Sequence, residues 1–273
     1  MRRILTRLSR LLLALVAAIP LSMCCSVADS TPRSPLASEL IVDEFSGPAG
    51  SAPDPNLWAY DVGPSPEKGW ERGSLQTYTD SVDNVRLDGQ GHLVIEARKS
   101  GSKYTSGRIV TRGKLDFQYG TINARIKFPS GQGIWPAFWM LGSDIDKVGW
   151  PQCGEIDIME IVNTGKTYNV RLHGPPAPDT EVGPSGSIAD LTEDFHIYWV
   201  TREKDRVTIG VDEGTLWSFT PSSLPPGAPW VFNNPMHVLL NIAVGGDWPG
   251  PPDDSTRFPA TMLVDWIRFD PAT

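Results

Sequence analysis

The sequence predicts an all-β fold, a β-sandwich or jelly roll, and three observations support this class. After residue 40 the apolar residues recur with a period of two, and not with the 3.6-residue period of a helix. Short loops rich in Gly, Pro, Asp and Ser separate the apolar runs. The 273 residues suit one large β domain, and nothing in the sequence marks a second domain boundary.

The first thirty residues have the layout of a secretory signal peptide. Residues 1–10 are basic, residues 11–21 are almost wholly apolar, and a polar run completes the segment. The apolar part is too short to span a membrane, which requires about 20 residues. We therefore expect the protein to be exported, either secreted or held at the cell surface. The residues before Cys24 and Cys25 loosely resemble a lipobox, so a lipid anchor at one of these cysteines is an alternative.

Residues 31–40, rich in Pro and Ser, are interpreted as a short linker, and residues 41–273 as a single domain. The net charge of −8 and the lack of a basic stripe argue against nucleic acid and anionic membranes as partners. Three cysteines exclude a scaffold built on disulfides, and Cys153 would stand alone after loss of residues 1–30. A monomer is the default expectation.

The clearest predicted strand lies at residues 122–128. There Ile122, Ala124, Ile126 and Phe128 alternate with polar residues, as in a strand with one buried face. No window has the caps and spacing of a long amphipathic helix. The other predicted strands are 93–97, 156–161, 195–201, 207–211, 236–243 and 262–269.

Three carboxylates lie within six residues of an otherwise apolar strand, at Glu155, Asp157 and Glu160. Charges in such a strand are costly to bury unless they face a cleft. In a regular strand Glu155 and Asp157 share one face and Glu160 takes the other. A β-bulge near residues 158–159 would bring all three to one side, and bulges are frequent beside active sites. The spacing therefore predicts a bulged strand with three acids in one groove.

Two Glu and one Asp in one groove suit the hydrolysis of a glycosidic bond. A retaining enzyme places a carboxylate nucleophile and a carboxylic acid about 5–5.5 Å apart. Repulsion between like charges in a dry groove would keep a proton on one of them. From the residues alone, a calcium site and a solvated sheet face remain alternatives. A zinc site is disfavoured, because the four histidines are scattered along the sequence.

Further motifs accompany the segment 154–160. They lie at residues 104–108, 119–120, 133–141, 241–246, 248–250 and 264–265. In this order they resemble glycoside hydrolase family 16, in its laminarinase-like branch, over most of the chain. The resemblance implies a jelly roll of two curved antiparallel sheets with a glycan-binding cleft on the concave face. It also implies a secreted retaining endo-β-1,3-glucanase, with a polysaccharide as its partner and no cofactor in catalysis.

The resemblance also implies a role for each acid. Glu155 would be the nucleophile, Glu160 the acid/base and Asp157 their helper, while Met159 is the extra residue of the bulged branch. The same chemistry on mixed-linkage glucan or a galactan, or transfer to a sugar instead of water, are alternatives. A non-catalytic glucan-binding protein of this fold is the alternative from another class, although such proteins usually lack a catalytic carboxylate.

The resemblance further implies a set of substrate-binding residues. They are Trp135, Trp139, Trp150, His173, Asn84, Arg108 and Trp248. Indole rings offer flat apolar faces on which sugar rings rest. Trp139 has a place in the core as its alternative, and Asn84 and Arg108 have exposed turns as theirs. His173 is expected beside the acid/base, on the side of the leaving sugar.

A structural calcium ion on the convex face is the last feature that the resemblance implies. Its matching positions are Glu44, Gly91 and Asp265. The ligands would be mostly backbone oxygens, so that the ion would contribute to stability and not to chemistry.

Overall fold

The computed structural model describes residues 35–64, 71–176, 179–189 and 191–272, which belong to the compact unit Arg33–Thr273. The predicted signal peptide lies outside the described residues, together with Cys24 and Cys25, and export stays a prediction. Within the described ranges, no helix is long and apolar enough to cross a membrane.

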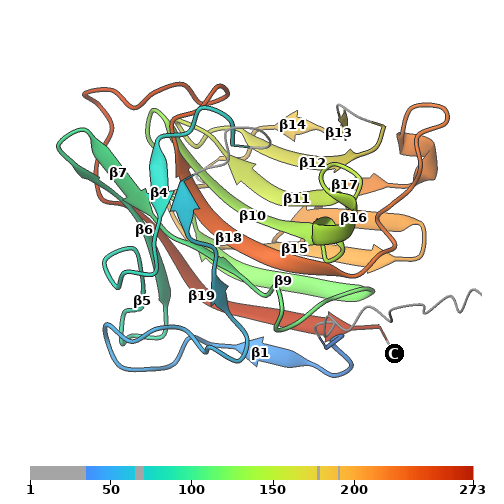
Figure 1. Cartoon of the computed structure of the whole chain (residues 1–273), viewed down its shortest axis with the longest axis horizontal. Helices are drawn as coiled ribbons and strands as arrows, with labels where there is room; N and C mark the ends of the chain where they lie inside the picture. The colour runs from blue at the N-terminus through green and yellow to red at the C-terminus, as the bar shows by residue number, and fades with distance from the viewer. Residues whose placement is uncertain (1–34, 65–70, 177–178, 190, 273) are drawn as a thin grey trace, which may run out of the picture. The chain divides into compact units, whose positions relative to one another are not determined.

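Two large sheets make up the fold (Figure 1). The first contains, in order of pairing, β17 (Gly214–Phe219), β16 (Arg206–Val211), β15 (His196–Glu203), β9 (Gly120–Lys127), β19 (Ala260–Pro271), β6 (Leu93–Ser100), β7 (Lys103–Ser106), β4 (Gln76–Tyr78) and β3 (Gly63–Pro64), with β1 (Ile41–Asp43) beside β19 and β5 (Val85–Leu87) beside β6. The second contains β13 (Thr180–Val182), β12 (Tyr168–Gly174), β11 (Glu155–Ile161), β10 (Ile134–Gly142), β18 (Met236–Val244), β8 (Arg108–Val110) and β2 (Ala59–Tyr60), with β14 (Ser185–Gly186) beside β12.

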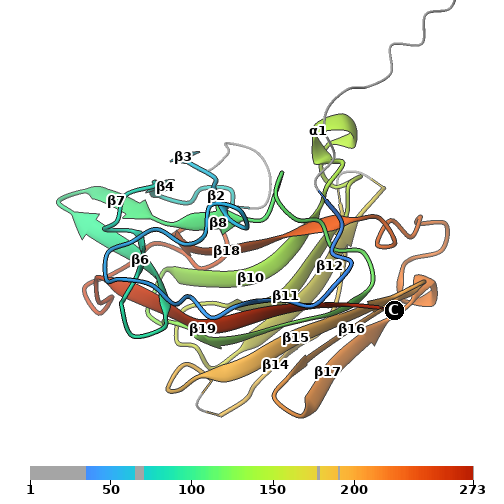
Figure 2. The same ribbon diagram turned by 90° about the horizontal axis from the view of Figure 1, so that it is seen from below.

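Among the described strands every pairing is antiparallel except β4 with β7. The described helices are short: the α-helix α1 (Ile145–Val148) and the 3-10 helix η1 (Pro221–Ser223). Figure 2 shows β10 and β18 of the second sheet as one layer, with β19, β15 and β16 of the first sheet as the other. The predicted all-β jelly-roll class is confirmed.

The core fills the space between the two sheets. In β9 the side chains of Ile122, Ala124 and Ile126 are buried while their neighbours are half-buried, as the alternation predicts. In β10 and β18 every residue is buried, because side chains cover both faces of these central strands. Phe138 is fully buried on the core face of β10.

The bulge predicted at residues 158–159 is present in β11. On one side Met159 pairs with Phe138 and Asp157 pairs with Trp139, so Ile158 has no partner in the register. On the other side the register with β12 also shifts between Asp157 and Glu160. The extra residue turns Glu160 to the face that carries Asp157.

Part of the predicted linker is attached to the domain. The backbone N–H of Asp116 donates to the carbonyl of Pro35 at 2.9 Å, and the N–H of Ala37 donates to the carbonyl of Asp116, also at 2.9 Å. These bonds fix residues 35–37 against the strand segment before β9. Residues 35–37 of the predicted linker therefore pair with the domain, and the domain boundaries stay a prediction.

Candidate active site

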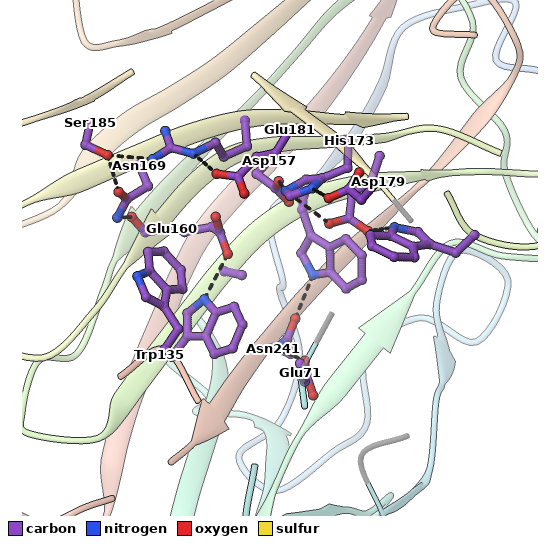
Figure 3. Close-up of a pocket in the computed structure, with 16 residues that line it drawn as sticks. Glu71, Trp135, Asp157, Glu160, Asn169, His173, Asp179, Glu181, Ser185 and Asn241 are labelled. Atoms are coloured by element: carbon purple, nitrogen blue, oxygen red, sulfur yellow. Dashed lines mark hydrogen bonds and ion pairs between the residues drawn. The ribbon is translucent and has the colours of Figure 1, made fainter. Parts of the chain in front are cut away.

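A cavity of about 420 Å³ opens on the face of the second sheet that points away from the core. From β11, Glu155, Asp157 and Glu160 all line this cavity. From β10, Trp135 and Trp139 line it, because every second residue of a strand shares a face. Figure 3 shows the labelled carboxylates and rings pointing toward one another from these strands. The structure thus brings together residues from adjacent strands that the sequence separates.

Each of the three carboxylates is almost fully buried; the two glutamates each accept a hydrogen bond from an indole N–H, and Asp157 forms an ion pair with His173. The indole Nε1–H of Trp150 donates to Oε2 of Glu155 at 3.0 Å. The indole Nε1–H of Trp135 donates to Oε1 of Glu160 at 2.9 Å. Oδ2 of Asp157 lies 3.2 Å from Nε2 of His173. Two flat rings therefore fix the directions of the two glutamates.

Burial and mutual repulsion make these groups hold protons. Burial raises the pKa of Glu160 to about 8, and the charge of Asp157 adds to this shift. Burial and the same neighbour also raise the pKa of Glu155 well above its ordinary value. Burial raises the pKa of Asp157, although its contact with His173 opposes the shift. Three carboxylates this close cannot all ionise at neutral pH, so the cluster retains a proton.

His173 carries the positive charge in this cluster. Burial alone would lower the pKa of the imidazole, but contacts with Asp157 and Asp179 raise it to about 12. Its Nδ1 lies 2.7 Å from Oδ2 of Asp179, and its Nε2 lies 3.9 Å from Oε1 of Glu155. Because the imidazolium contacts Asp157 and Glu155, negative charge is favoured on these two and the proton on Glu160.

Tryptophan rings form the walls and floor of the cavity. Trp248 is exposed and stands edge-on to Trp135, with ring centroids 5.1 Å apart. The Nε1–H of Trp139 donates to Oδ1 of Asn241 at 2.7 Å, so this ring lies on the floor although it is buried. Trp150 packs beside His173, with centroids 6.1 Å apart. The four tryptophans expected in the cleft all line it.

Asn84 and Arg108 lie outside this cavity. The side-chain amide of Asn84 is buried and donates to the backbone carbonyl of Glu96 at 2.8 Å. The guanidinium of Arg108 is also buried, 2.9 Å from Oδ2 of Asp61 and 4.5 Å from the ring centroid of Tyr78. Asn84 bonds to β6 and β7 of the first sheet, while Arg108 lies in β8 of the second sheet, and neither occupies the exposed turn that was their alternative. A sugar contact at either stays a prediction.

Several cavity residues were not identified in the sequence. They are Glu71, Ala137, Asn169, Arg171, Asp179, Glu181, Ser185 and Asn241. Asn241 and Ala137 lie within segments that carried the family resemblance, which was the available signal. Of the others, Asn169 and Arg171 come from β12 and the rest from loops and edge strands, where isolated polar residues give no pattern.

Two groups of side chains in the described residues have the spacing of a metal site: Glu155 with Asp157 and His173, and His173 with Asp179 and Glu181. Both groups depend on His173. A protonated imidazole has no lone pair for a metal, and both ring nitrogens of His173 face carboxylates. The contacts therefore favour a proton over a metal ion at this position.

Two of the three positions predicted for calcium, Glu44 and Asp265, lie at neighbouring segments of the first sheet. Oδ2 of Asp265 forms an ion pair with Nη1 of Arg125 at 2.6 Å, and the side chain of Glu44 is exposed. Asp43 pairs with Ile267, so the backbone of β1 runs toward the bulge of β19 that contains Asp265. The segments that carry Glu44 and Asp265 are therefore neighbours in the first sheet, and calcium stays a prediction.

Comparison with known proteins agrees with the chemistry that the site geometry indicates. The sequence profile of Glycosyl hydrolases family 16 matches residues 73–268. The chain belongs to glycoside hydrolase family 16. The resemblance noted in the sequence is confirmed, and the chain is a glycoside hydrolase.

The relatives of this family 16 chain are named as glucanases or laminarinases. It is 38% identical over 268 residues to a beta-glucanase from Rhodothermus marinus, covering 89% of each chain. It resembles the solved laminarinase catalytic domain of Thermotoga maritima MSB8 with a TM-score of 0.76 and 38% identity, covering 85% of this chain and 97% of that one. It also resembles SCLam, a non-specific endo-β-1,3(4)-glucanase, with a TM-score of 0.73 and 36% identity, covering 87% of this chain and 93% of that one.

Proposed function

We propose that this family 16 chain is a retaining endo-β-1,3-glucanase. The observation that carries the proposal is the pair of glutamates on one bulged strand, each with its own indole donor, beside a charged His173. The names of the relatives, a beta-glucanase and a laminarinase, support β-1,3-glucan as the substrate.

The reaction proceeds in two displacements. Glu160 gives its proton to the glycosidic oxygen while the carboxylate of Glu155 forms a bond to the anomeric carbon, and the leaving sugar departs as an alcohol. Glu160, now ionised, then takes a proton from water, and the water oxygen displaces Glu155 from the anomeric carbon. Asp157 and His173 keep negative charge on the nucleophile side of the cavity. The tryptophan faces hold the sugar rings on either side of the bond that breaks.

Substrate panels test the proposal. We expect release of reducing sugar from laminarin that vanishes in the Glu155→Gln variant, with the fold retained. Wild-type activity in that variant would overturn the assignment of the nucleophile. Release from agarose or carrageenan alone would keep the chemistry and replace the substrate, and binding of laminarin without release would favour a glucan-binding protein. Proton NMR of the first product anomer distinguishes retention from inversion.

Mixed-linkage glucan is the second candidate substrate. The name of SCLam, a non-specific endo-β-1,3(4)-glucanase that is 36% identical to this chain, favours it. Release from lichenan at a rate comparable to laminarin would support this broader activity. Release from laminarin alone would restrict the enzyme to β-1,3 linkages.

Export of the mature enzyme is also proposed. It rests on the basic, apolar and polar succession of residues 1–30. Mass spectrometry of the protein from the culture medium and from the membrane fraction would give the mature N-terminus. A mature chain that begins with a lipid-modified Cys24 or Cys25 would show the anchored alternative, and an intact Met1 in the cytosol would contradict export.

A further inference from the structure

Histidine–aspartate pairs recur in the described part of the chain, and one of them differs from the others. The distance from the histidine Nδ1 to the aspartate Oδ2 is 2.6 Å for His92–Asp88, 2.7 Å for His173–Asp179 and 2.8 Å for His196–Asp212. Of these three histidines, His173 alone also directs its second ring nitrogen at carboxylates of the cavity, Asp157 and Glu155.

We propose that Asp179 is a positioning residue, which holds the ring of His173 through Nδ1 so that its Nε2–H faces Asp157 and Glu155. The proposal rests on the proposed function, since it takes Glu155 and Glu160 as the reacting carboxylates. Asp179 contacts His173 and acts through that ring. Figure 3 shows His173 between Asp157 and Asp179.

The contact with His173 is the bond that orients Asp179 in the described structure. Oδ2 of Asp179 lies 2.7 Å from Nδ1, while its Oδ1 is buried and has no hydrogen bond to a described residue. The side chains are 17% exposed for His173 and 21% exposed for Asp179, so solvent screens the pair only weakly. Because the imidazole ring is planar, a bond that fixes Nδ1 also fixes the direction of Nε2.

The other charged groups around the ring do not replace Asp179. The groups that face His173 from neighbouring elements are Asp157 and Glu155 on β11, Asp179 and Glu181 at β13, and Arg171 on its own strand. Oε1 of Glu181 is engaged by Nε of Arg171 at 2.7 Å. On the side of the ring away from β11, the balancing carboxylate is therefore Asp179.

The consequence concerns the charge on the nucleophile. With both nitrogens protonated, His173 stabilises the ionised forms of Asp157 and Glu155. Without the Asp179 carboxylate, burial would favour the neutral ring, which can turn and can present a lone pair to Asp157. Negative charge on Glu155 would then lose its nearest cation.

Kinetics on laminarin provide the first test. Since the lost interaction affects the reacting groups and not sugar binding, Asp179→Ala should lower kcat by about 10- to 100-fold, with KM changed less than about threefold. Asp179→Asn keeps an oxygen that accepts from Nδ1–H and should recover part of this loss. Asp212→Asn makes the same change in the pair with His196 outside the cavity and should retain the wild-type kcat.

The protonation state of His173 provides a test that needs no activity. Proton–nitrogen NMR of histidine-labelled protein should show both ring nitrogens protonated from about pH 5 to 9 in the wild type, with His173→Gln to assign the signals. In Asp179→Ala the ring should titrate within this range. A ring that stays doubly protonated in that variant, or a kcat equal to that of Asp212→Asn, would overturn the proposal. Activity in Glu155→Gln would instead overturn the proposed function, and the NMR result would still test the contact.

Discussion

Trp135 donates its indole N–H to Oε1 of Glu160 at 2.9 Å, from the strand next to the one that carries the carboxylate. A donor of this kind stabilises the ionised form of the carboxyl and opposes the effect of burial on its pKa, which nevertheless reaches about 8. In the proposed mechanism Glu160 protonates the leaving sugar, so activity should fall as the pH rises through about 8.

Removal of this donor should move the alkaline limb of the pH profile. In Trp135→Phe the ionised form of Glu160 loses a hydrogen bond, so its pKa rises and the limb of kcat/KM should shift upward by about 1 pH unit. Trp248→Phe is the matched control, since Trp248 touches Trp135 and gives Glu160 no hydrogen bond among the described contacts. That control should raise KM and leave the limb in place; an unchanged limb in Trp135→Phe would contradict the role of the indole.

The buried acid should also cost stability at neutral pH. The folded-state pKa of Glu160, about 8, exceeds the ordinary value of 4.5, so the folded chain binds more protons than the unfolded chain between these values. Stability therefore decreases as the pH rises through this window, by at most about 1.4 kcal/mol per pH unit. Glu160→Gln removes this dependence and should have the higher Tm at pH 7, by a margin that grows from pH 5 to pH 8. Thermal melts at several pH values check this, and parallel curves for the two proteins would refute it.

Asn241 connects the floor of the cavity to a loop that is distant in the sequence. Its Nδ2 lies 3.1 Å from Oε1 of Glu71 and 3.0 Å from the hydroxyl of Tyr78, while its Oδ1 accepts from Trp139. Asn241→Ala leaves these buried groups without a partner and should destabilise the fold by about 2 kcal/mol. Urea unfolding measures the loss. Asn123→Ala, at a half-buried position of the other sheet, should change stability by less than about 0.5 kcal/mol.

The bulge predicts unequal effects of two one-residue changes in β11. Deletion of Met159 removes the extra residue, so the third acid follows Asp157 at an interval of two and stays on the same face. That variant should fold and retain measurable activity. An Ala inserted after Ile158 would turn Glu160 into the core and should abolish folding or turnover. Circular dichroism with a laminarin assay distinguishes these results, and an inactive, folded deletion variant would contradict the expected register.

The sequence was informative wherever one strand carried its own pattern. Alternation in residues 122–128 predicted β9, and the spacing of Glu155, Asp157 and Glu160 predicted the bulge. β10 was absent from the predicted strands, because its run is apolar throughout and contains Pro136, which normally argues against a central strand. Only the structure shows that this run has the core on one face and the cavity on the other.

The polar residues of the cavity could not be predicted from local pattern. Glu71 and Asn241 are bonded to each other across 170 residues of sequence, and Asp179 reaches His173 from a loop. Asn84 was expected to contact sugar, because its side-chain amide suits that role, but the amide instead donates to the backbone carbonyl of Glu96. Such partners depend on how the sheets pack, which no single segment of the chain contains.

The bulge at residues 158–159 also makes the active site tolerant to the loss of one residue. In a regular strand, gain or loss of one residue inverts every side chain beyond it. In β11 the extra residue lies at the bulge, where the pairing register shifts against both neighbouring strands. Loss of a single codon can therefore remove the bulge, and the bend that it causes, while the three acids stay on one face. A search for related enzymes should accept both spacings of the third acid.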